Sequence, residues 1–246
     1  MKADPADQLT LLDLQTTDSA LARLAHQKKT LPELARLAEI QTERAELDRV
    51  RVTHQTRAGD LEREQRKADT EVELVRTRKA RDEDRLNSGA ISNPKDLESL
   101  QHELVALERR IGVLEDAELE VMEALEAAQS EVSAVEAKLA HLDAERADLE
   151  AKRDTAVAEL DEQATAHQAD HADIVGRVPA DLLALYEKLR AQYGMGAAAL
   201  RQRRCEGCRL ELNGSDLREI AAAAEDTVVR CPECSRILVR TAESGL

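Results

Sequence analysis

Four cysteines in two closely spaced pairs are the residues best suited to chemistry in this chain. The pairs are Cys205-x-x-Cys208 and Cys231-x-x-Cys234, 22 residues lie between them, and the chain has no other cysteine. Short spacers let each pair aim two sulfurs at one point, as in knuckles that hold one tetrahedral zinc ion. The spacing therefore predicts one structural Zn²⁺ bound by Cys205, Cys208, Cys231 and Cys234.

Disulfides and a thioredoxin-like redox pair are the alternatives for these thiols. Neither pair lies in a βαβ pattern, and the start of the chain lacks the apolar segment of a signal peptide, so we expect a cytoplasmic, reducing environment. Four thiolates leave no open coordination position on zinc. We therefore expect a structural metal rather than a catalytic one.

Arginines gather around the first cysteine pair in a chain that is acidic elsewhere. Arg201, Arg203, Arg204 and Arg209 flank Cys205 and Cys208, whereas the whole chain has a formal net charge of -15. These four residues are candidate contacts for nucleic acid or for a partner protein. Against nucleic acid, residues 195–246 hold 8 basic and 8 acidic side chains, and the chain has no Phe or Trp to stack on bases.

The composition favours long helices over a compact globular core. Aromatic residues make up 1% of the chain and charged residues 35%, which is typical of helices that bury a narrow seam. No apolar run is long enough to span a membrane. No phosphate-binding loop, nucleophile elbow or dinucleotide motif is present, and no pocket is expected for a small-molecule substrate, so we predict that the protein is not an enzyme.

Heptad patterns and turn residues divide the chain. Apolar residues alternate at spacings of three and four from Leu97 to Leu160, interrupted only by Glu118, Arg146 and Arg153, as in a coiled coil. We expect a mainly α chain: a helical hairpin over residues 1–178, a connecting helix over 179–194 and a zinc ribbon with few short strands over 195–246. Within the hairpin we expect a short helix over 5–28, long arms over 31–86 and 94–175, and a tip over 87–93.

The two arms differ in charge. Residues 44–81 carry 11 Lys/Arg and 8 Asp/Glu, and residues 97–173 carry 6 Lys/Arg and 21 Asp/Glu. Arms joined by a short tip must run antiparallel where they touch, and opposite charges favour pairing within one chain over dimers of the acidic arm. The sequence therefore predicts an intramolecular antiparallel coiled-coil hairpin.

Several local signals lead to more specific expectations. Thr30 and Glu33 fit a capping box at the start of the first long arm, and Ser215 is a candidate cap for a short helix over 216–224. Residues 227–231 and 236–241 have the pattern of strands. His54 occupies a heptad position and is interpreted as a tolerated seam residue or a register device. The face shared by His167 and His171 is interpreted as solvated surface in preference to a weak metal site.

Three segments in combination resemble one family. They are Gly89–Glu103, which reads GAISNPKDLESLQHE, then LYEKLR over 185–190, then CPECSRIL over 231–238, which closes the second cysteine pair. Together the chain is similar to bacterial C4-type zinc ribbon proteins with an N-terminal coiled-coil hairpin. The resemblance implies a bent helical hairpin topped by a zinc ribbon, with the four cysteines as ligands and no enzyme activity. Relatives of this type are associated with protein partners of secretion or flagellar machinery and sigma factors, and RNA binding has been proposed for some.

Two functions follow as expectations. The first is a non-enzymatic adaptor or chaperone-like scaffold, in which the coiled coil and the ribbon bind partner proteins of unknown identity. The alternative is a DNA- or RNA-binding regulator that uses the basic edge of the ribbon.

Overall fold

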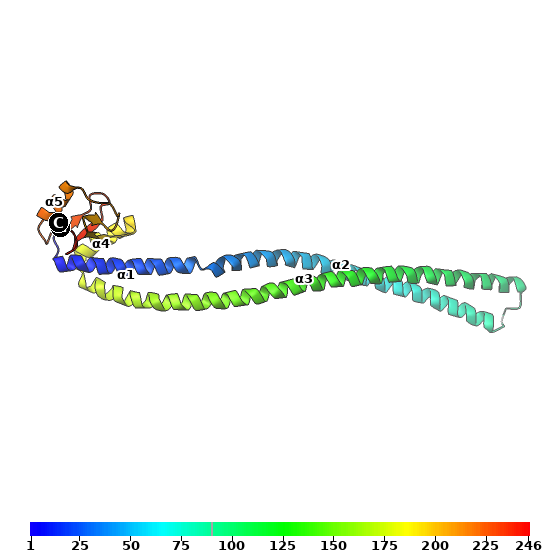
Figure 1. Ribbon diagram of the computed structural model, residues 1–246. Coiled ribbons are helices and arrows are strands. Elements are labelled where there is room, and N and C mark those ends of the chain that lie inside the picture. Colours follow the sequence, from blue (N-terminus) through cyan, green and yellow to red (C-terminus); the bar gives the residue numbers. More distant parts are fainter. Residues whose placement is uncertain (90) are drawn as a thin grey trace. The chain divides into compact units, whose positions relative to one another are not determined.

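The computed structural model describes residues 1–89 and 91–246 and is mainly helical (Figure 1). Two of the helices are very long: α2 covers Pro32–Asn87 and α3 covers Pro94–Arg177. The remaining elements are α1 Pro5–Lys29, α4 Ala180–Tyr193, β1 Ala197–Arg201, β2 Arg204–Cys205, α5 Gly214–Ala222, β3 Val229–Arg230 and β4 Ile237–Arg240. The predicted fold class, a coiled-coil hairpin followed by a small ribbon, is confirmed.

The chain forms two compact units. One, called the head here, contains Met1–Leu34 and Ala151–Leu246; the other, called the hairpin unit, contains Ala35–Glu150. The first helix therefore belongs to the same unit as the ribbon.

A narrow seam holds α2 and α3 together in the hairpin unit. Ala58 of α2 forms a buried cluster with Leu125 and Ala128 of α3, and half-buried Leu61 packs against it. Seam residues toward the tip, such as Leu107 and Leu114, are also buried. This one-sided burial is what apolar residues at alternating spacings of three and four produce when two helices pair.

Ion pairs join the two arms, with the cation on the basic arm and the carboxylate on the acidic arm, as their net charges predict. Arg36 of α2 meets both carboxylate oxygens of Glu145, at 2.7 and 3.0 Å. Arg76 meets Glu115 at 2.6 Å. Further pairs of the same polarity are Arg44 with Asp143, Arg78 with Glu103 and Lys79 with Glu108. In each pair the cation lies on α2 and the carboxylate on α3, so the charge difference helps to set the antiparallel register.

His54 is a seam residue, as interpreted from its heptad position. Its Nδ1 lies 2.8 Å from Oε2 of Glu131 on the opposite helix, and its side chain is 26% exposed. A polar residue inside a coiled-coil seam weakens packing but disfavours other registers. The His54–Glu131 pair therefore marks one alignment of the two arms.

Removing the inter-arm contact of Arg36 should lower the thermal unfolding midpoint of the hairpin unit. The guanidinium also pairs with Glu39 and Glu43 of its own helix, and the hydrogen bonds that it donates to Glu145, Glu43 and Glu39 raise the pKa of Arg36 above its ordinary value. Circular dichroism melts of Arg36→Ala and of Arg49→Ala test this. Arg49 is the control because its carboxylate partner, Glu46, lies on its own helix. Equal midpoints for the two variants would show that the inter-arm pairs contribute nothing.

The head has a core built from helices and strands together. Leu11 and Leu14 of α1, Ile174 of α3 and Tyr186 of α4 pack with Ile237 of β4 in one buried cluster. Tyr186 is the largest fully buried side chain of the described residues. The ribbon is therefore not an isolated small domain, because one side of its sheet is covered by three helices.

The four strands of the head form one sheet in the order β2-β1-β4-β3. β1 pairs in parallel with β4, from Ala197 beside Ile237 to Leu200 beside Arg240. The segments predicted as strands at 227–231 and 236–241 contain β3 and β4, which are shorter than expected. β1 was not predicted. Its first four residues are all buried, so it lacks the alternation that marks a half-exposed strand.

Two predicted helix caps are wrong. The hydroxyl of Thr30 donates back to the carbonyl of His26 at 3.0 Å, so Thr30 ends α1, and Oε2 of Glu33 is buried without a hydrogen-bond partner. At α5 the cap is Asn213, whose side-chain oxygen accepts from the backbone N–H groups of Ser215 and Asp216. Asn is as good an N-cap as Ser, and the local pattern did not separate the two.

A zinc centre closed by two matching knuckles

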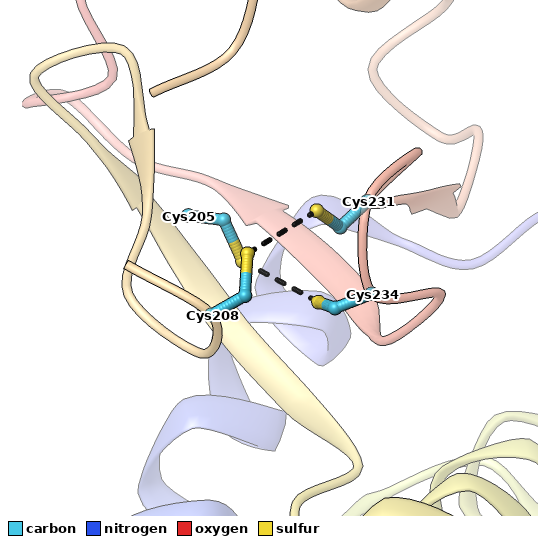
Figure 2. Close-up of side chains that lie close together, drawn as sticks. All are labelled: Cys205, Cys208, Cys231 and Cys234. Carbon is cyan, nitrogen blue, oxygen red and sulfur yellow. Dashed lines mark hydrogen bonds between the residues drawn. The ribbon is translucent and has the colours of Figure 1, made fainter. Parts of the chain in front are cut away.

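The four cysteine sulfurs point toward one another from two separate loops (Figure 2). The Sγ atoms of Cys205 and Cys234 are 3.9 Å apart, as are those of Cys208 and Cys231, and all four atoms lie within 4.8 Å of one another. Zn–S bonds of about 2.3 Å in a tetrahedron place sulfurs about 3.8 Å apart. The geometry fits one four-thiolate Zn²⁺, and the cofactor prediction is confirmed.

The backbone of the two cysteine loops is nearly the same. Arg209 and Ser235 each follow the second cysteine of a pair, and both have a φ of 62°. Their N–H groups donate to the carbonyls of Cys205 and Cys231, at 2.7 and 2.8 Å. A left-handed residue after the second cysteine closes each loop tightly enough to bring both sulfurs to one side. Neither position is glycine, so the sequence offered no signal for this turn.

The thiols differ in their surroundings. Burial raises the pKa of the Cys205 and Cys231 thiols above the ordinary value. Burial also opposes ionisation of Cys234, but hydrogen bonds from Arg236 lower the pKa of this thiol to about 7. Zinc must displace the protons of these two buried thiols, which resist ionisation in the free protein. Zinc binding and folding of the knuckles are therefore coupled.

A second small core surrounds the metal ligands. Leu212, Leu217 and Ile220, from α5 and the segment before it, bury their side chains with Cys205 and Cys231. Gly207 lies against β1, where an added Cβ would come within 2.9 Å of the Cβ of Ala198. The first knuckle therefore packs on the sheet at a distance that only glycine permits. Among the described residues of this core, α5 is the only helix that contributes side chains, so the metal supplies stabilisation that apolar area does not.

The N-terminal residues are bound to the ribbon. The N–H of Ala3 donates to the carbonyl of Asp226 at 2.8 Å, and the N–H of Val228 donates to the carbonyl of Met1 at 3.1 Å. Nε2 of Gln8 adds a bond to the carbonyl of Glu225 at 3.1 Å. These contacts join α1 to the segment between α5 and β3, which explains why the first helix and the ribbon form one unit.

A buried carboxylate in α1 is the centre of a polar cluster that sequence reasoning missed. Asp18 is 2% exposed and accepts a hydrogen bond from the Tyr186 hydroxyl at 2.6 Å. Its other oxygen, Oδ1, lies 3.0 Å from the Arg190 guanidinium and 3.2 Å from Nε2 of His171. Burial, and then the bond to Asp18, raise the pKa of Tyr186 far above its ordinary value. The tyrosine therefore stays protonated and remains a donor to Asp18.

The assignment of His171 to solvated surface is wrong. The imidazole is 31% exposed and contacts Asp18 across the helix interface. Next to this contact, Oε1 of Gln15 accepts from the backbone N–H of Gly196 at 2.8 Å. Gly196 is obligatory here, because an added Cβ would lie 2.5 Å from the carbonyl oxygen of Tyr186. The side chain of Gln15 on α1 thus accepts a hydrogen bond from the backbone between the end of α4 and the start of β1.

The structure separates the four candidate contact arginines into two kinds. The guanidinium of Arg201 pairs with Glu206 at 3.1 Å and with Glu243 at 2.6 Å. Arg203, Arg204 and Arg209 are exposed, and within residues 1–89 and 91–246 they make no ion pair. Leu210, 50% exposed, follows directly. The knuckle surface, defined as Arg203, Arg204, Arg209 and Leu210, therefore displays three unpaired cations beside an exposed apolar side chain.

Among the described residues, none of the helices is both long and apolar enough to cross a membrane.

Comparison with known proteins gives a consistent result over nearly the whole chain. Residues 14–194 match the model of a CT398-like coiled coil hairpin domain, and residues 204–238 match that of a C4-type zinc ribbon domain. The chain is 39% identical to the uncharacterized protein Rv2229c of Mycobacterium tuberculosis over 240 residues, 98% of each chain. Neither family description names an enzymatic activity.

Solved structures support the same assignment. A protein of Mycobacterium smegmatis is 38% identical, with a TM-score of 0.85 over 98% of this chain and 100% of that one. CT398 of Chlamydia trachomatis is 17% identical, with a TM-score of 0.68 over 96% of this chain and 98% of that one, which shows a shared fold. The chain therefore belongs to the family of CT398-like coiled-coil hairpin proteins with a C4-type zinc ribbon.

Proposed function

We propose that this protein is a non-enzymatic adaptor or chaperone-like scaffold that binds partner proteins through its coiled coil and its ribbon. The observation that carries the proposal is the composite head. A ribbon closed by four thiols is packed on three helices and holds the knuckle surface in a defined geometry. Four thiolates leave zinc no position for a substrate, which supports a structural use of the metal.

The hairpin unit supports the same function. Its outer surface carries exposed apolar residues on both long helices, among them Leu74 at 66% and Leu119 at 55%. Long helices that expose such side chains are suited to pairing with further helices, a common mode of protein recognition. A scaffold of this kind needs no pocket.

A nucleic-acid-binding regulator is the second candidate, favoured by one observation. Arg203, Arg204 and Arg209 are unpaired cations on one small surface, as phosphate contacts would require. Arg201 adds less, because two carboxylates already neutralise it. The formal net charge of -15 opposes long-range attraction to a polyphosphate.

Affinity capture from extract, with and without nuclease and at low and high salt, tests the two candidates. The bait proteins are the intact chain, a knuckle variant with Arg203, Arg204 and Arg209 replaced by Gln, and a control with Arg66, Lys67 and Arg81 of α2 replaced by Gln. The control removes the same charge from exposed residues outside the head. We expect the intact chain to retain defined proteins after nuclease treatment and at high salt. The knuckle variant should lose part of these proteins.

Two results would contradict the adaptor. Recovery of nucleic acid that falls steeply with salt and is lost only in the knuckle variant would establish the regulator instead. Equal recovery of every protein by the intact chain and by a matrix without bait would leave no partner for a scaffold to bind.

A further inference from the structure

A second apolar stripe runs along α3, apart from the seam. Val105, Leu119 and Met122 are 52%, 55% and 42% exposed, whereas the seam residues Leu107 and Leu114 are buried. Val105 and Leu119 are separated by two heptads, and Met122 lies three residues farther, so the three side chains share one flank of the helix. Isolated exposed apolar residues are common, but a row at coiled-coil spacing is the arrangement that pairs with a helix.

Gly112 lies halfway along this stripe, seven residues from both Val105 and Leu119. An added Cβ at this position would meet nothing within 4 Å, so glycine is not required by packing inside the hairpin unit. Its absence of a side chain leaves a shallow step in the row, at which an approaching helix can come close to α3. The stripe therefore consists of Val105, Gly112, Leu119 and Met122.

The surroundings of the stripe are acidic on balance: Arg109 and Arg110 lie on α3 between Val105 and Gly112, but the section around Leu119 and Met122 carries carboxylates alone. Residues 115–126 include six carboxylates and no basic residue. Of these, Glu115 pairs with Arg76 of α2. The others make no ion pair in the part of the chain that the structure describes: Asp116, Glu118, Glu120, Glu123 and Glu126. Unpaired carboxylates that flank exposed Leu119 and Met122 make this section of α3 both acidic and apolar.

This charge distinguishes between the helices that could cover the stripe. A second copy that used the same face would bring two sets of five unpaired carboxylates together and offer only Arg109 and Arg110 to offset them, so like-charge repulsion disfavours it. A helix with an apolar row bordered by Lys and Arg would bury Leu119 and Met122 and neutralise the carboxylates. We propose that the stripe of Val105, Gly112, Leu119 and Met122 is the docking site for a basic amphipathic helix of a partner protein. The inference rests on the proposed adaptor function, for which it names the surface and the partner chemistry.

A synthetic peptide probes this site in the full-length zinc-loaded protein. The probe is a labelled helical peptide of about 20 residues, about 30 Å long, with Leu at heptad positions and Lys and Arg beside them. Two peptides of the same length serve as controls: one carries Glu in place of Lys and Arg, and the other has the basic composition in an order without helical periodicity. Fluorescence anisotropy measures the Kd of each. We expect the basic amphipathic peptide to bind and the controls to bind at least about tenfold more weakly.

Variants locate the binding. Leu119→Gln with Met122→Gln should weaken binding of the basic peptide about tenfold or more, because two apolar contacts are lost. Gln keeps a helix propensity close to that of Leu and Met, so α3 should remain folded, as circular dichroism will show. Val113→Gln is the matched control: Val113 is 59% exposed on the same helix but follows Gly112 by one residue, about 100° around the axis. Its Kd should equal that of the unaltered protein.

Three results would overturn the proposal. Equal loss of binding in the Val113 control and the double variant would show that no particular stripe is used. Unchanged binding in the double variant would show that the peptide binds only by general attraction between opposite charges. Sedimentation that shows a dimer of the protein, abolished by Leu119→Gln with Met122→Gln, would make a second copy the occupant. None of these results affects capture of proteins by the knuckle surface, so the adaptor function can fail or stand separately.

Discussion

Removal of zinc should unfold the knuckles and α5 while leaving the long helices intact. Structural zinc binding contributes about 10 kcal/mol or more to folding of such sites, and the small core around Cys205 and Cys231 has little else to hold it. β1 and β4 differ from the rest of the ribbon, because Ala197, Ile237 and Val239 also pack in the helical core of the head. We therefore expect loss of structure at β2, α5 and β3, and partial retention at the β1–β4 pair.

Hydrogen exchange of the full-length protein, before and after chelation, measures this division of the head. Cys231→Ser should reproduce the chelated pattern and bind less than one equivalent of zinc, whereas Leu210→Ala, beside the first knuckle but exposed, should behave as the unaltered protein. The helical signal in circular dichroism should change little, because all four cysteines lie outside α2 and α3. Equal exchange at α5 with and without zinc would refute a structural role for the metal.

Replacing Asp18 by Asn should cost the head about 2–3 kcal/mol of unfolding free energy. The carboxylate is 2% exposed and is shared by Tyr186, His171 and Arg190. Asn removes the negative charge that Arg190 and His171 face. Its amide group also places a hydrogen-bond donor where the neighbouring groups are themselves donors. Loss of one partner from a buried polar network leaves the others uncompensated, although partial exposure of His171 and Arg190 moderates the cost.

Denaturant unfolding of Asp18→Asn and Asp13→Asn measures this contribution. Asp13 is the matched control because it lies on the exposed face of α1 and its side chain makes no ion pair among the described residues. Tyr186→Phe should give a smaller loss than Asp18→Asn, since it removes a single donor. If Asp18→Asn were as stable as Asp13→Asn, the cluster would contribute nothing to the unfolding free energy of the head.

The same cluster should make the stability of the head depend on pH in the alkaline range. The folded pKa of Tyr186 lies above its unfolded value of about 10. Below pH 10 both states hold the proton and the stability is fully present; above it the unfolded chain loses the proton first, so stability falls as the pH rises. The direction of this effect follows from burial of the hydroxyl, which disfavours the tyrosinate.

The docking stripe and the knuckle surface differ in how far the sequence revealed them. Arg203, Arg204 and Arg209 stood out as a basic group in an acidic chain, and the structure adds that they are unpaired whereas Arg201 is not. Val105, Leu119 and Met122 lie outside the three-four series of the seam, but they did not stand out, because single exposed apolar residues are common on helices. The structure adds that the three side chains are exposed while the seam residues beside them are buried.

Patterns that depend on neighbouring residues were determined by the sequence itself. The heptads predicted two long helices because burial in a coiled coil repeats with a period close to that of the helix. The short tip predicted that the arms run antiparallel, their charge difference predicted that they pair within one chain, and the paired spacing of the cysteines predicted the zinc site. Each of these signals is carried by residue types at short, regular intervals.

Features built from residues far apart in the chain were decided by the tertiary structure. Asp18 meets Tyr186 only because α1 packs on α4, and a single aspartate in a helix otherwise predicts solvated surface. β1 exists because β4 pairs with it in parallel and buries four successive residues, which leaves no alternation to read. The first helix shares a core with the ribbon for the same reason: long-range contacts depend on which faces meet in space, and spacing along the chain does not encode that.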